Sequence, residues 1–372
     1  MATFVWQLAS WPILRWNDGA LLEPLSRSSH AQGRLFGQLE ALGFEQERQA
    51  LEVEALVEEA VTTSAIEGER LSREAVRSSV ARRLGLDSAG LPTPPRHVDG
   101  LVEMLLDATG RHDEPLTAER LKGWQAALFP TGYSGLSRIR AGEWRDGPMQ
   151  VVSGPIGRER VHFEAPPAER VAEEIQRLLA WWESSAGNLN GMVRAGVAHL
   201  WFETIHPFED GNGRVGRALA DMALAQAEKR RRRFYSLSSQ INEERSAYYQ
   251  AIEEAQGGGG DITPWLTWFL ACVRRAIERS GREVEAALKR ARFWQRPSAY
   301  GLNERQAKAM ARLLEAGPGG FQGGLTNQKY RGMTKASKVT ATRDLTDLLG
   351  RGLLVQRGEG RSTRYELNWE LL

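Results

Sequence analysis

One short stretch of the chain, His206–Arg217, brings an imidazole, two carboxylates, three glycines and two arginines together. It follows an apolar segment, Val193–Ile205, whose spacing predicts a helix. Gly211 and Gly213 carry no side chains, so several backbone N–H groups can converge on one point. The start of a following helix adds unpaired N–H groups and a partial positive charge. We therefore expect this loop to cradle an anion such as a phosphate.

Five polar side chains could act around this cradle. Asn212 could supply further donors, and Arg214 and Arg217, three residues apart, could grip one polyphosphate from one helix face. Asp210 is a hard oxygen ligand of the kind that Mg²⁺ takes together with phosphate oxygens and water. His206 could accept a proton from a hydroxyl group near neutral pH. A base, a metal ligand, an anion cradle and two arginines are the parts that phosphoryl or nucleotidyl transfer needs.

Each of these residues has a plainer explanation when it is taken alone. A histidine at a helix end is usually structural, Asp210 could cap a turn, and arginines on a helix are usually solvated. The segment Gly211–Gly216 also matches G-x-G-x-x-G, but the dinucleotide-binding pattern requires a preceding buried strand. A helical segment and His-Pro precede it here, and no G-x-x-x-x-G-K-[ST] pattern occurs in the chain. The joint spacing therefore favours phosphoryl or nucleotidyl transfer over a dehydrogenase or an ordinary P-loop protein.

The stretch His206–Arg217 resembles the signature of the Fic family, H-P-F-x-D/E-G-N-G-R-x-x-R, at every defined position. The resemblance extends over residues 93–276. It implies a mostly helical Fic-type core with a β-hairpin flap. It also implies a protein adenylyltransferase that moves AMP from Mg-ATP to a Ser, Thr or Tyr hydroxyl of a target protein or of itself.

The resemblance assigns a part to each defined position of the motif. His206 would be the catalytic base, and Asp210 would hold Mg²⁺ on the phosphates of ATP. The nucleotide-binding positions of the motif would be Gly211, Asn212, Gly213, Arg214 and Arg217. Among them, Arg217 would hold the γ-phosphate.

Two other parts of the core resemble family features. The segments Met149–Val152 and Arg160–Phe163 are short apolar runs among glycines and prolines, which predicts a β-hairpin. The resemblance makes this hairpin the flap, whose edge could pair with an extended target segment, while a purely structural hairpin is the alternative. Tyr249 and Gln256 fall where family members line the adenine pocket.

An N-terminal helix carries Thr63-Ser-Ala-Ile-Glu67-Gly68, which resembles the family's inhibitory motif, [S/T]-x-x-x-E-[G/N]. If Glu67 reaches Arg217, it occupies the positive charge meant for the γ-phosphate and leaves ATP misaligned. We therefore expect Glu67, with Thr63 and Gly68, to inhibit the enzyme. In some relatives this glutamate orients water for the removal of AMP, so the reverse reaction stays open. A surface glutamate at a helix end is the plainer alternative.

The C-terminal segment differs from the rest of the chain in charge. Residues 289–364 hold sixteen Lys or Arg against five Asp or Glu, although the whole chain carries only +2. Its pattern predicts three helices and then two strands joined by a basic turn: Asn303–Leu314, Asn327–Arg331, Ala336–Leu349, Leu353–Gln356 and Tyr365–Asn368. This order resembles a winged helix-turn-helix, a module that binds DNA or protein. The residues that could meet DNA phosphates are Lys335, Lys338, Arg343, Arg361 and Arg364.

The whole chain is expected to be mostly α, in three parts. Residues 1–90 would form a helical extension with the inhibitory helix, 91–290 the Fic core, and 291–372 the winged helix, an α+β module. A single cysteine, Cys272, excludes an internal disulfide. We find neither a signal peptide nor an apolar run of about 18 residues. A cytoplasmic protein without a membrane partner is therefore expected.

Two other functions stay open. The chain could be a DNA-binding transcriptional regulator whose Fic core only senses a nucleotide, and an operator bound equally well by a His206→Ala variant would favour this alternative. It could also be an enzyme of the same kind that uses UTP, GTP or CDP-choline as the donor. Fic relatives often pair, so a homodimer is a further expectation.

Overall fold

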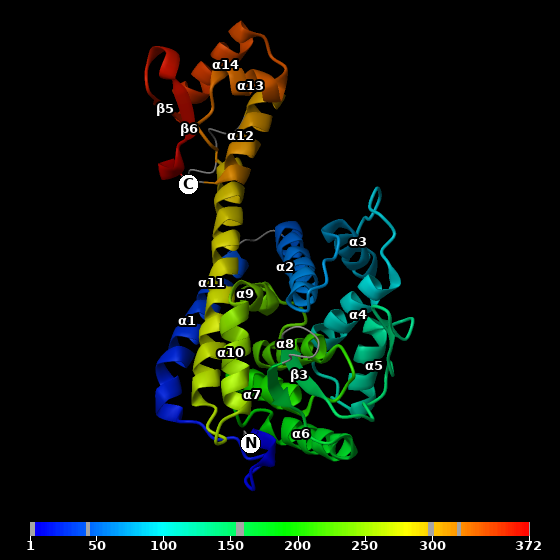
Figure 1. Ribbon diagram of the computed structural model, residues 1–372. Coiled ribbons are helices and arrows are strands. Elements are labelled where there is room, and N and C mark those ends of the chain that lie inside the picture. Colours follow the sequence, from blue (N-terminus) through cyan, green and yellow to red (C-terminus); the bar gives the residue numbers. More distant parts are fainter. Residues whose placement is uncertain (1–3, 42–44, 154–159, 297–300, 318–320, 372) are drawn as a thin grey trace. The chain divides into compact units, whose positions relative to one another are not determined.

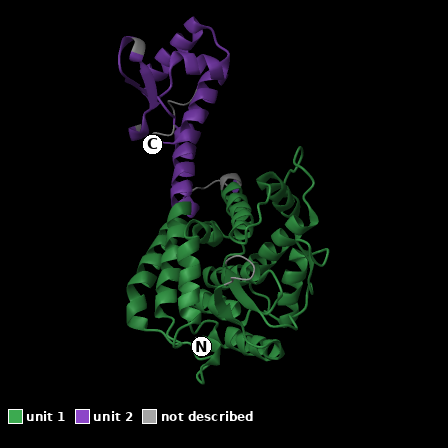
Figure 2. Cartoon of the chain, viewed as in Figure 1, with its two compact units in different colours: residues 1–36, 48–280 green, residues 37–47, 281–372 purple. Residues whose placement is uncertain are grey.

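Helices dominate the computed structural model, which describes residues 4–41, 45–153, 160–296, 301–317 and 321–371 (Figure 1). The mostly α fold predicted from the helical spacing is confirmed. The chain divides into two compact units, Met1–Phe36 with Arg48–Ser280, and Gly37–Glu47 with Gly281–Leu372 (Figure 2). None of the helices in the described ranges is both long and apolar enough to cross a bilayer.

Most of the described helices lie wholly or mainly in the first unit. In chain order they are α1 (Asp18–Ala41), α2 (Glu45–Ile66), α3 (Arg73–Arg83), α4 (Arg96–Gly110), α5 (Ala118–Leu128), α6 (Val171–Ser185), α7 (Gly191–Ile205), α8 (Asn212–Glu228), α9 (Leu237–Glu243), α10 (Arg245–Gln256) and α11 (Thr263–Trp294). Ahead of α1, residues Val5–Gln7 form one 3-10 turn. The short helix α9 was not predicted.

The two helices that flank the sequence motif form the centre of the first unit. Every residue of α7 from Met192 to Ile205 is buried, and so are the residues of α8 from Val215 to Ala225. The two helices make the most extensive helix pair in the described chain. A mostly apolar helix must be covered on all sides. Each fully buried Leu, Val or Phe side chain contributes about 1.5–3 kcal/mol to the free energy of folding. The loop between α7 and α8 is thereby held between two firmly packed helix ends.

Two-stranded antiparallel hairpins interrupt the helices. They pair β1 (Tyr133–Ser134) with β2 (Ser137–Arg138), β3 (Gln150–Ser153) with β4 (Arg160–Glu164), and β5 (Leu354–Arg357) with β6 (Arg364–Leu367). The hairpin predicted over 149–163 is present as β3 and β4, with Gln150 opposite Glu164. Residues 154–159 of this predicted flap lie outside the described residues. The β1–β2 hairpin was not predicted.

The N-terminal segment 4–17 is built into the first unit. Trp6 Nε1 donates a hydrogen bond to the carbonyl oxygen of Glu164, at the end of β4, over 2.7 Å. Trp11 Nε1 donates to Glu174 Oε2, on α6, over 2.8 Å. Most of the predicted N-terminal extension thus shares one compact unit with the motif, while the three-part division of the chain stays a prediction.

The second unit has its own apolar core. Its main elements are α12 (Glu304–Ala316), α13 (Asn327–Thr334), α14 (Lys338–Gly350) and the hairpin β5–β6, in the predicted order. Side chains from all of them meet in one cluster that includes Met310, Leu313, Tyr330, Ala341, Leu345, Leu354 and Leu367. Capping side chains begin each helix: Asn303, Thr326 and Ser337. The assignment of this unit as a winged helix stays a prediction.

Candidate active site

The loop between α7 and α8 contains two residues with left-handed backbone conformation. His206 ends α7 with a φ of 49°, and Gly211 begins α8 with a φ of 87°. A Cβ at Gly211 would lie 2.9 Å from the ring of Phe129, so both the φ angle and the space require glycine. The first N–H groups of α8 have no acceptor within the helix and face the loop. The local geometry is therefore that of the predicted anion cradle.

The side chain of Asn212 braces this loop. Its Oδ1 accepts a hydrogen bond from the backbone N–H of Phe208 at 2.9 Å, and its Nδ2 donates to the Phe208 carbonyl at 2.8 Å. One N–H of the amide is thus engaged by the loop, and the second is left as a donor. The backbone N–H of Asn212, at the start of α8, is a further donor. That either group binds a phosphate stays a prediction.

The imidazole of His206 is held in one orientation. Nδ1 lies 3.3 Å from the carbonyl oxygen of Glu203. Since a carbonyl can only accept, Nδ1 carries the proton and Nε2 keeps the lone pair of the neutral ring. The side chain is 19% exposed, and burial lowers the pKa of His206 to about 4. The ring is therefore neutral at pH 7, with an acceptor nitrogen available to a hydroxyl group.

Arg145, which sequence reasoning missed, ties the histidine to the base of the predicted flap. Its Nε donates to the carbonyl oxygen of His206 at 2.8 Å. Its Nη1 donates to the carbonyl of Gly147 at 2.8 Å, and its Nη2 donates to that of Pro166 at 2.5 Å. Gly147 and Pro166 flank the β3–β4 hairpin, so one buried guanidinium joins both ends of the hairpin to the loop.

Asp210 presents the kind of carboxylate that a magnesium ion takes. Oδ1 accepts from the backbone N–H of Gly211 at 2.5 Å and lies 3.8 Å from Arg214 Nη2, while Oδ2 accepts from the hydroxyl of Ser134. The side chain is 41% exposed. Within the described ranges no three His, Cys, Asp or Glu side chains form a metal cluster. One exposed carboxylate beside an anion cradle fits Mg²⁺, which fills its other positions with phosphate oxygens and water.

Arg217 is almost fully buried, and its partners come from the end of α2 and the turn that follows it. Nη2 donates to Glu67 Oε1 at 2.8 Å and to the carbonyl of Thr63 at 2.9 Å, and Nε donates to the Thr63 hydroxyl at 2.8 Å. Burial, the largest single influence, favours a higher pKa for Glu67, but the charge and hydrogen bond of Arg217, together with the charge of Arg214, outweigh it and the pKa is lowered. Glu67 is therefore ionised at neutral pH. The structure brings Thr63, Glu67 and Arg217 together as the motifs predicted.

The carboxylate of Glu67 lies over the first turn of α8. A Cβ on Gly213 would lie 2.3 Å from Glu67 Oε1 and 3.0 Å from Arg217 Nη1. Any side chain at position 213 would therefore displace the carboxylate. The chain then turns at Gly68, whose φ is 85°, as the predicted end of the inhibitory motif requires. An internal anion thus sits where the start of a helix would bind a phosphate.

Arg214 also faces a carboxylate, that of Glu69, which sequence reasoning missed. Its Nη1 donates to Glu69 Oε2 at 3.1 Å, and its guanidinium lies 5.0 Å from the centroid of the Phe129 ring. Its Nε is buried without a hydrogen-bond partner in the described part of the chain. Glu67 and Glu69 belong to one turn, so a single short segment covers both arginines of the motif.

Replacing Glu69 with Gln is expected to tighten the binding of ATP about two- to fivefold, because it frees the charge of Arg214 while keeping the side-chain volume. The gain is small because Glu69 is 39% exposed, and solvent weakens such pairs. Calorimetric titration with a non-hydrolysable ATP analogue measures the change. The matched control is Glu103→Gln on α4, which removes an exposed ion pair with Arg83 of α3. Equal dissociation constants for parent and Glu69→Gln would contradict the prediction.

The two predicted adenine-pocket residues lie on α10. Tyr249 is 42% exposed, and its hydroxyl donates to the carbonyl of Ile66, at the end of α2, over 3.3 Å. Gln256 is buried at the last position of the helix. Tyr249 therefore lies beside the segment that carries Glu67, while the adenine-binding role of both residues stays a prediction.

The residues predicted to meet DNA belong to the second unit. Lys335 ends α13, Lys338 and Arg343 lie on α14, and Arg364 lies on β6; all four are exposed. The side chain of Arg361 lies outside the described residues. The structure thus gathers Lys335, Lys338 and Arg343 around the start of α14, and leaves their partner open.

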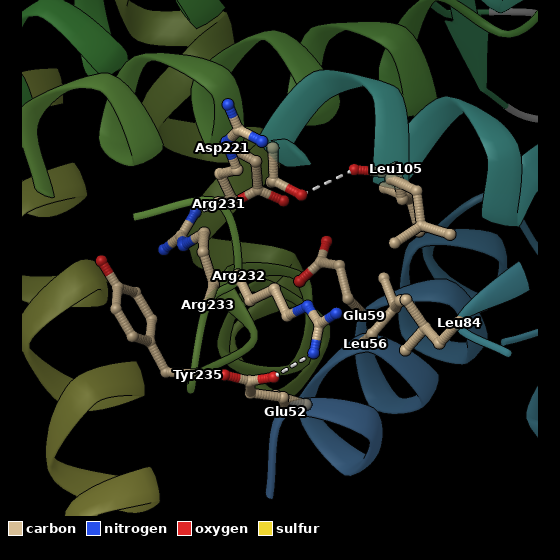
Figure 3. Close-up of a pocket in the computed structure, with 13 residues that line it drawn as sticks. Glu52, Leu56, Glu59, Leu84, Leu105, Asp221, Arg231, Arg232, Arg233 and Tyr235 are labelled. Carbon is tan, nitrogen blue, oxygen red and sulfur yellow. Dashed lines mark hydrogen bonds and ion pairs between the residues drawn. The ribbon is translucent and has the colours of Figure 1, made fainter. Parts of the chain in front are cut away.

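A separate cavity of about 40 Å³ lies beside α2 (Figure 3). Glu59 is buried at its wall, where Oε2 accepts from the Ser236 hydroxyl at 2.7 Å, and Arg232 pairs with Glu52 at 2.8 Å. These contacts fasten α2 to the segment that follows α8. The volume suits one or two water molecules and not a nucleotide, and no residue of the motif lines it. The candidate active site is therefore the loop at the start of α8.

Family models match two parts of the chain. Residues 115–224 match the Fic/DOC family, and residues 4–86 match a domain of unknown function, DUF4172. The first match contains the motif with His206 and Arg217. The second contains α2, with Thr63 and Glu67. Both sides of the contact at Arg217 thus lie within matched regions.

Curated relatives carry adenylyltransferase names. A probable protein adenylyltransferase of Aquifex aeolicus is 31% identical over 94 residues, which cover 25% of this chain and 27% of the relative. The protein adenylyltransferase Fic of Drosophila mojavensis is 31% identical over 141 residues, 38% of this chain and 25% of the relative. The matched region spans about a quarter of the length of these relatives.

Solved structures share the fold. A Fic family protein from Desulfovibrio desulfuricans superposes with a TM-score of 0.51 and 20% identity, over 94% of this chain and 96% of its own. A Fic domain-containing signaling protein from Bacteroides thetaiotaomicron gives a TM-score of 0.51 and 19% identity, over 71% of this chain and 97% of its own. At these identities the likeness concerns the fold alone. The family-model match identifies residues 115–224 as a domain of the Fic/DOC family.

Proposed function

We propose that this chain is a protein adenylyltransferase that moves AMP from Mg-ATP to a Ser, Thr or Tyr hydroxyl, on a target protein or on itself. The adenylyltransferase names of the relatives support the reaction class. The observation that carries the proposal is the Glu67 carboxylate over the first turn of α8, bound to Arg217. A site that holds an internal anion at a helix start is built for the phosphates of a nucleotide.

The residues of the loop supply the parts of this reaction. His206 Nε2 takes the proton of the acceptor hydroxyl, whose oxygen attacks the α-phosphorus of ATP, and the bond to the leaving pyrophosphate breaks. Arg214 and the first N–H groups of α8 stabilise the negative charge on the phosphates. Asp210 would hold Mg²⁺, which supplies further neutralisation of that charge when bound.

Glu67 holds this site in an inhibited state. Its carboxylate occupies the Nη2 edge of Arg217, the group proposed to hold the γ-phosphate. ATP must displace the carboxylate before its chain of phosphates can align with His206. The same carboxylate, next to the reaction centre, could also orient water for the removal of AMP, so this reverse reaction belongs to the proposal as an option to be assayed.

The purified protein, incubated with labelled nucleotides and cell lysate, tests the proposed reaction. Label should reach protein from ATP labelled at the α-phosphate and not from ATP labelled at the γ-phosphate, because AMP and not phosphate is transferred. UTP, GTP and CDP-choline serve as competing donors in parallel reactions. Transfer of the γ-label, or labelling only from another donor, would overturn the assignment to ATP.

A second function, DNA binding by the second unit, is favoured by the charge around α14. Ser337 caps this helix, and Lys338 and Arg343 are exposed near its start, with no ion pair to a described carboxylate. Such unpaired cations at a helix that offers its first turns to solvent suit a phosphate backbone. This candidate would make the chain a regulator with or without transferase activity.

Replacing both Lys338 and Arg343 with Ala is expected to weaken binding to duplex DNA and to reduce the slope of log affinity against log salt by about 2, roughly one per lost phosphate contact. Fluorescence anisotropy with a random duplex at several salt concentrations measures the slope. Glu304→Gln, an exposed carboxylate on α12, is a control without expected effect on the slope. A parent chain that binds no duplex at low salt removes this candidate.

A further inference from the structure

Glu203 is a buried carboxyl group beside the candidate catalytic base. It lies on α7, three residues before His206, and its side chain is 11% exposed. Its Oε2 is 3.9 Å from His206 Nδ1. Its Oε1 is buried without a hydrogen-bond partner among the described residues. A buried carboxyl oxygen without a partner costs stability, so its position next to the reacting ring calls for a functional reason.

The space for this carboxyl group is left by Gly216. A Cβ at Gly216 would lie 2.5 Å from Glu203 Oε1 and 3.3 Å from His199 Nδ1. Position 216 falls at one of the three undefined positions of the family signature, so the signature itself does not require glycine there. In this chain glycine is required because any side chain at 216 would push the Glu203 carboxyl group away from its place.

The charges around Glu203 change in the proposed reaction. The titratable or charged groups that face it are Glu67 in the turn after α2, His199 of α7, His206 at the end of α7, Arg217 of α8 and Tyr248 of α10. With ATP bound, Arg217 would hold the γ-phosphate and Glu67 would leave it. Asp210, the other carboxylate near His206, would be neutralised by the metal. Glu203 would then be the closest free carboxyl group to the imidazole.

We infer that Glu203 is a positioning residue for His206: its carboxylate, 3.9 Å from Nδ1, balances the charge of the imidazolium that forms during transfer, while the Nδ1 proton stays hydrogen-bonded to the backbone carbonyl of Glu203. This inference rests on the proposed function. The acceptor hydroxyl gives its proton to Nε2, its oxygen bonds to the α-phosphorus, and pyrophosphate leaves with the electrons of the broken bond. Glu203 gains and loses no proton in this step; its carboxylate supplies charge and orientation, as a carboxylate does for a catalytic histidine elsewhere.

The protonation of Glu203 gives the inference a pH dependence. Burial raises the pKa of Glu203 to about 8; the charge of Arg217 opposes this shift and that of Glu67 adds to it. The ionised form, which supports His206, is therefore present above about pH 8 and lost below it. The rate of transfer should rise as the pH passes from 7 to 9. The titration of His206 does not change the rate between pH 7 and pH 9, since its pKa is about 4.

The test uses the full chain with Glu67→Gly, so that inhibition does not limit the rate. Glu203→Gln keeps the shape and the hydrogen-bonding capacity but cannot carry a charge. It should lower kcat for self-modification about 10- to 100-fold, the loss typical of an outer-shell partner, with KM for ATP unchanged, and it should abolish the rise between pH 7 and pH 9. Glu203→Asp should keep that rise at a lower rate. Glu174→Gln, another buried carboxyl on α6, should resemble the parent in both respects.

Each outcome separates the inference from the proposed function. A parent that transfers AMP, together with a Glu203→Gln variant of equal kcat and equal pH profile, would overturn the inference and leave the function standing. A parent inactive with every donor would overturn both. If Glu203→Gln fails to fold by circular dichroism, the pH profile of Glu203→Asp decides, because a flat profile there is incompatible with a titrating carboxylate.

Discussion

Replacing Glu67 with Gly is expected to raise self-modification with α-labelled ATP about ten- to a hundredfold. The carboxylate donates nothing to the transfer step, and its charge-assisted hydrogen bond to Arg217 at 2.8 Å must be broken before the γ-phosphate can bind. Bonds of this kind contribute about 1.5–3 kcal/mol, which corresponds to this range of rates. Incorporation of label into the purified chain over time gives the initial rate.

Two variants show whether the charge at position 67 is the cause. Glu67→Gln keeps a hydrogen-bond acceptor for Arg217 without the charge, so its rate should fall between those of the parent and of Glu67→Gly. Glu58→Gln, on the α2 helix that precedes Glu67 but paired with Arg73, should behave as the parent. Equal initial rates for Glu67→Gly and the parent would remove autoinhibition from the proposal.

Replacing His206 with Ala is expected to lower AMP transfer about a hundred- to ten-thousandfold, the range for loss of a general base. The neutral ring with its free Nε2 is the group in the loop that can accept the hydroxyl proton. Binding of ATP should change little, because the phosphates meet Arg214, Arg217 and the start of α8. The rate in the Glu67→Gly background and calorimetric titration with ATP measure the two quantities.

The backbone at His206 calls for a second variant. Its φ of 49° is costly for most residues but tolerated by Asn. His206→Asn should therefore retain the melting temperature of the parent and still lose transfer. Transfer by His206→Asn at the parent rate would show that another group serves as the base.

Much of the site could be predicted because its residues are close together in sequence. The spacing within 206–217 implies the geometry of a loop and a helix start, and all three glycines there have backbone or steric reasons in the structure. The pairing of Glu67 with Arg217 joins residues 150 positions apart. It was predictable only because the resemblance supplied a second motif.

The parts that were missed depend on the packing of distant segments. Arg145 reaches the carbonyl oxygen of His206 across 61 positions, and nothing in its neighbours in the sequence marks it. Glu69 lies one residue beyond the inhibitory motif, and only the turn at Gly68 brings it to Arg214. The two hydrogen bonds of the Asn212 side chain to the backbone of Phe208 were also not predicted.

The fold shows the same limit. Long helices, such as the apolar α7 and the following α8, lie where the sequence predicts them. The seven-residue helix α9 is too short to show a period, although Ser236 caps it. Residues 133–138 contain a two-residue pairing that no alternation of apolar residues reveals.

The attachment of the N-terminal segment to the first unit has a consequence for control in the cell. Because Trp6 and Trp11 fasten this segment to the same body that carries Arg217, the proposed inhibitor, Glu67, cannot diffuse away from the site that it would block. Its effective concentration is fixed by the chain and does not fall on dilution. The fraction of active molecules should thus be the same at low and high expression, and would change only when something competes for the turn that holds Glu67.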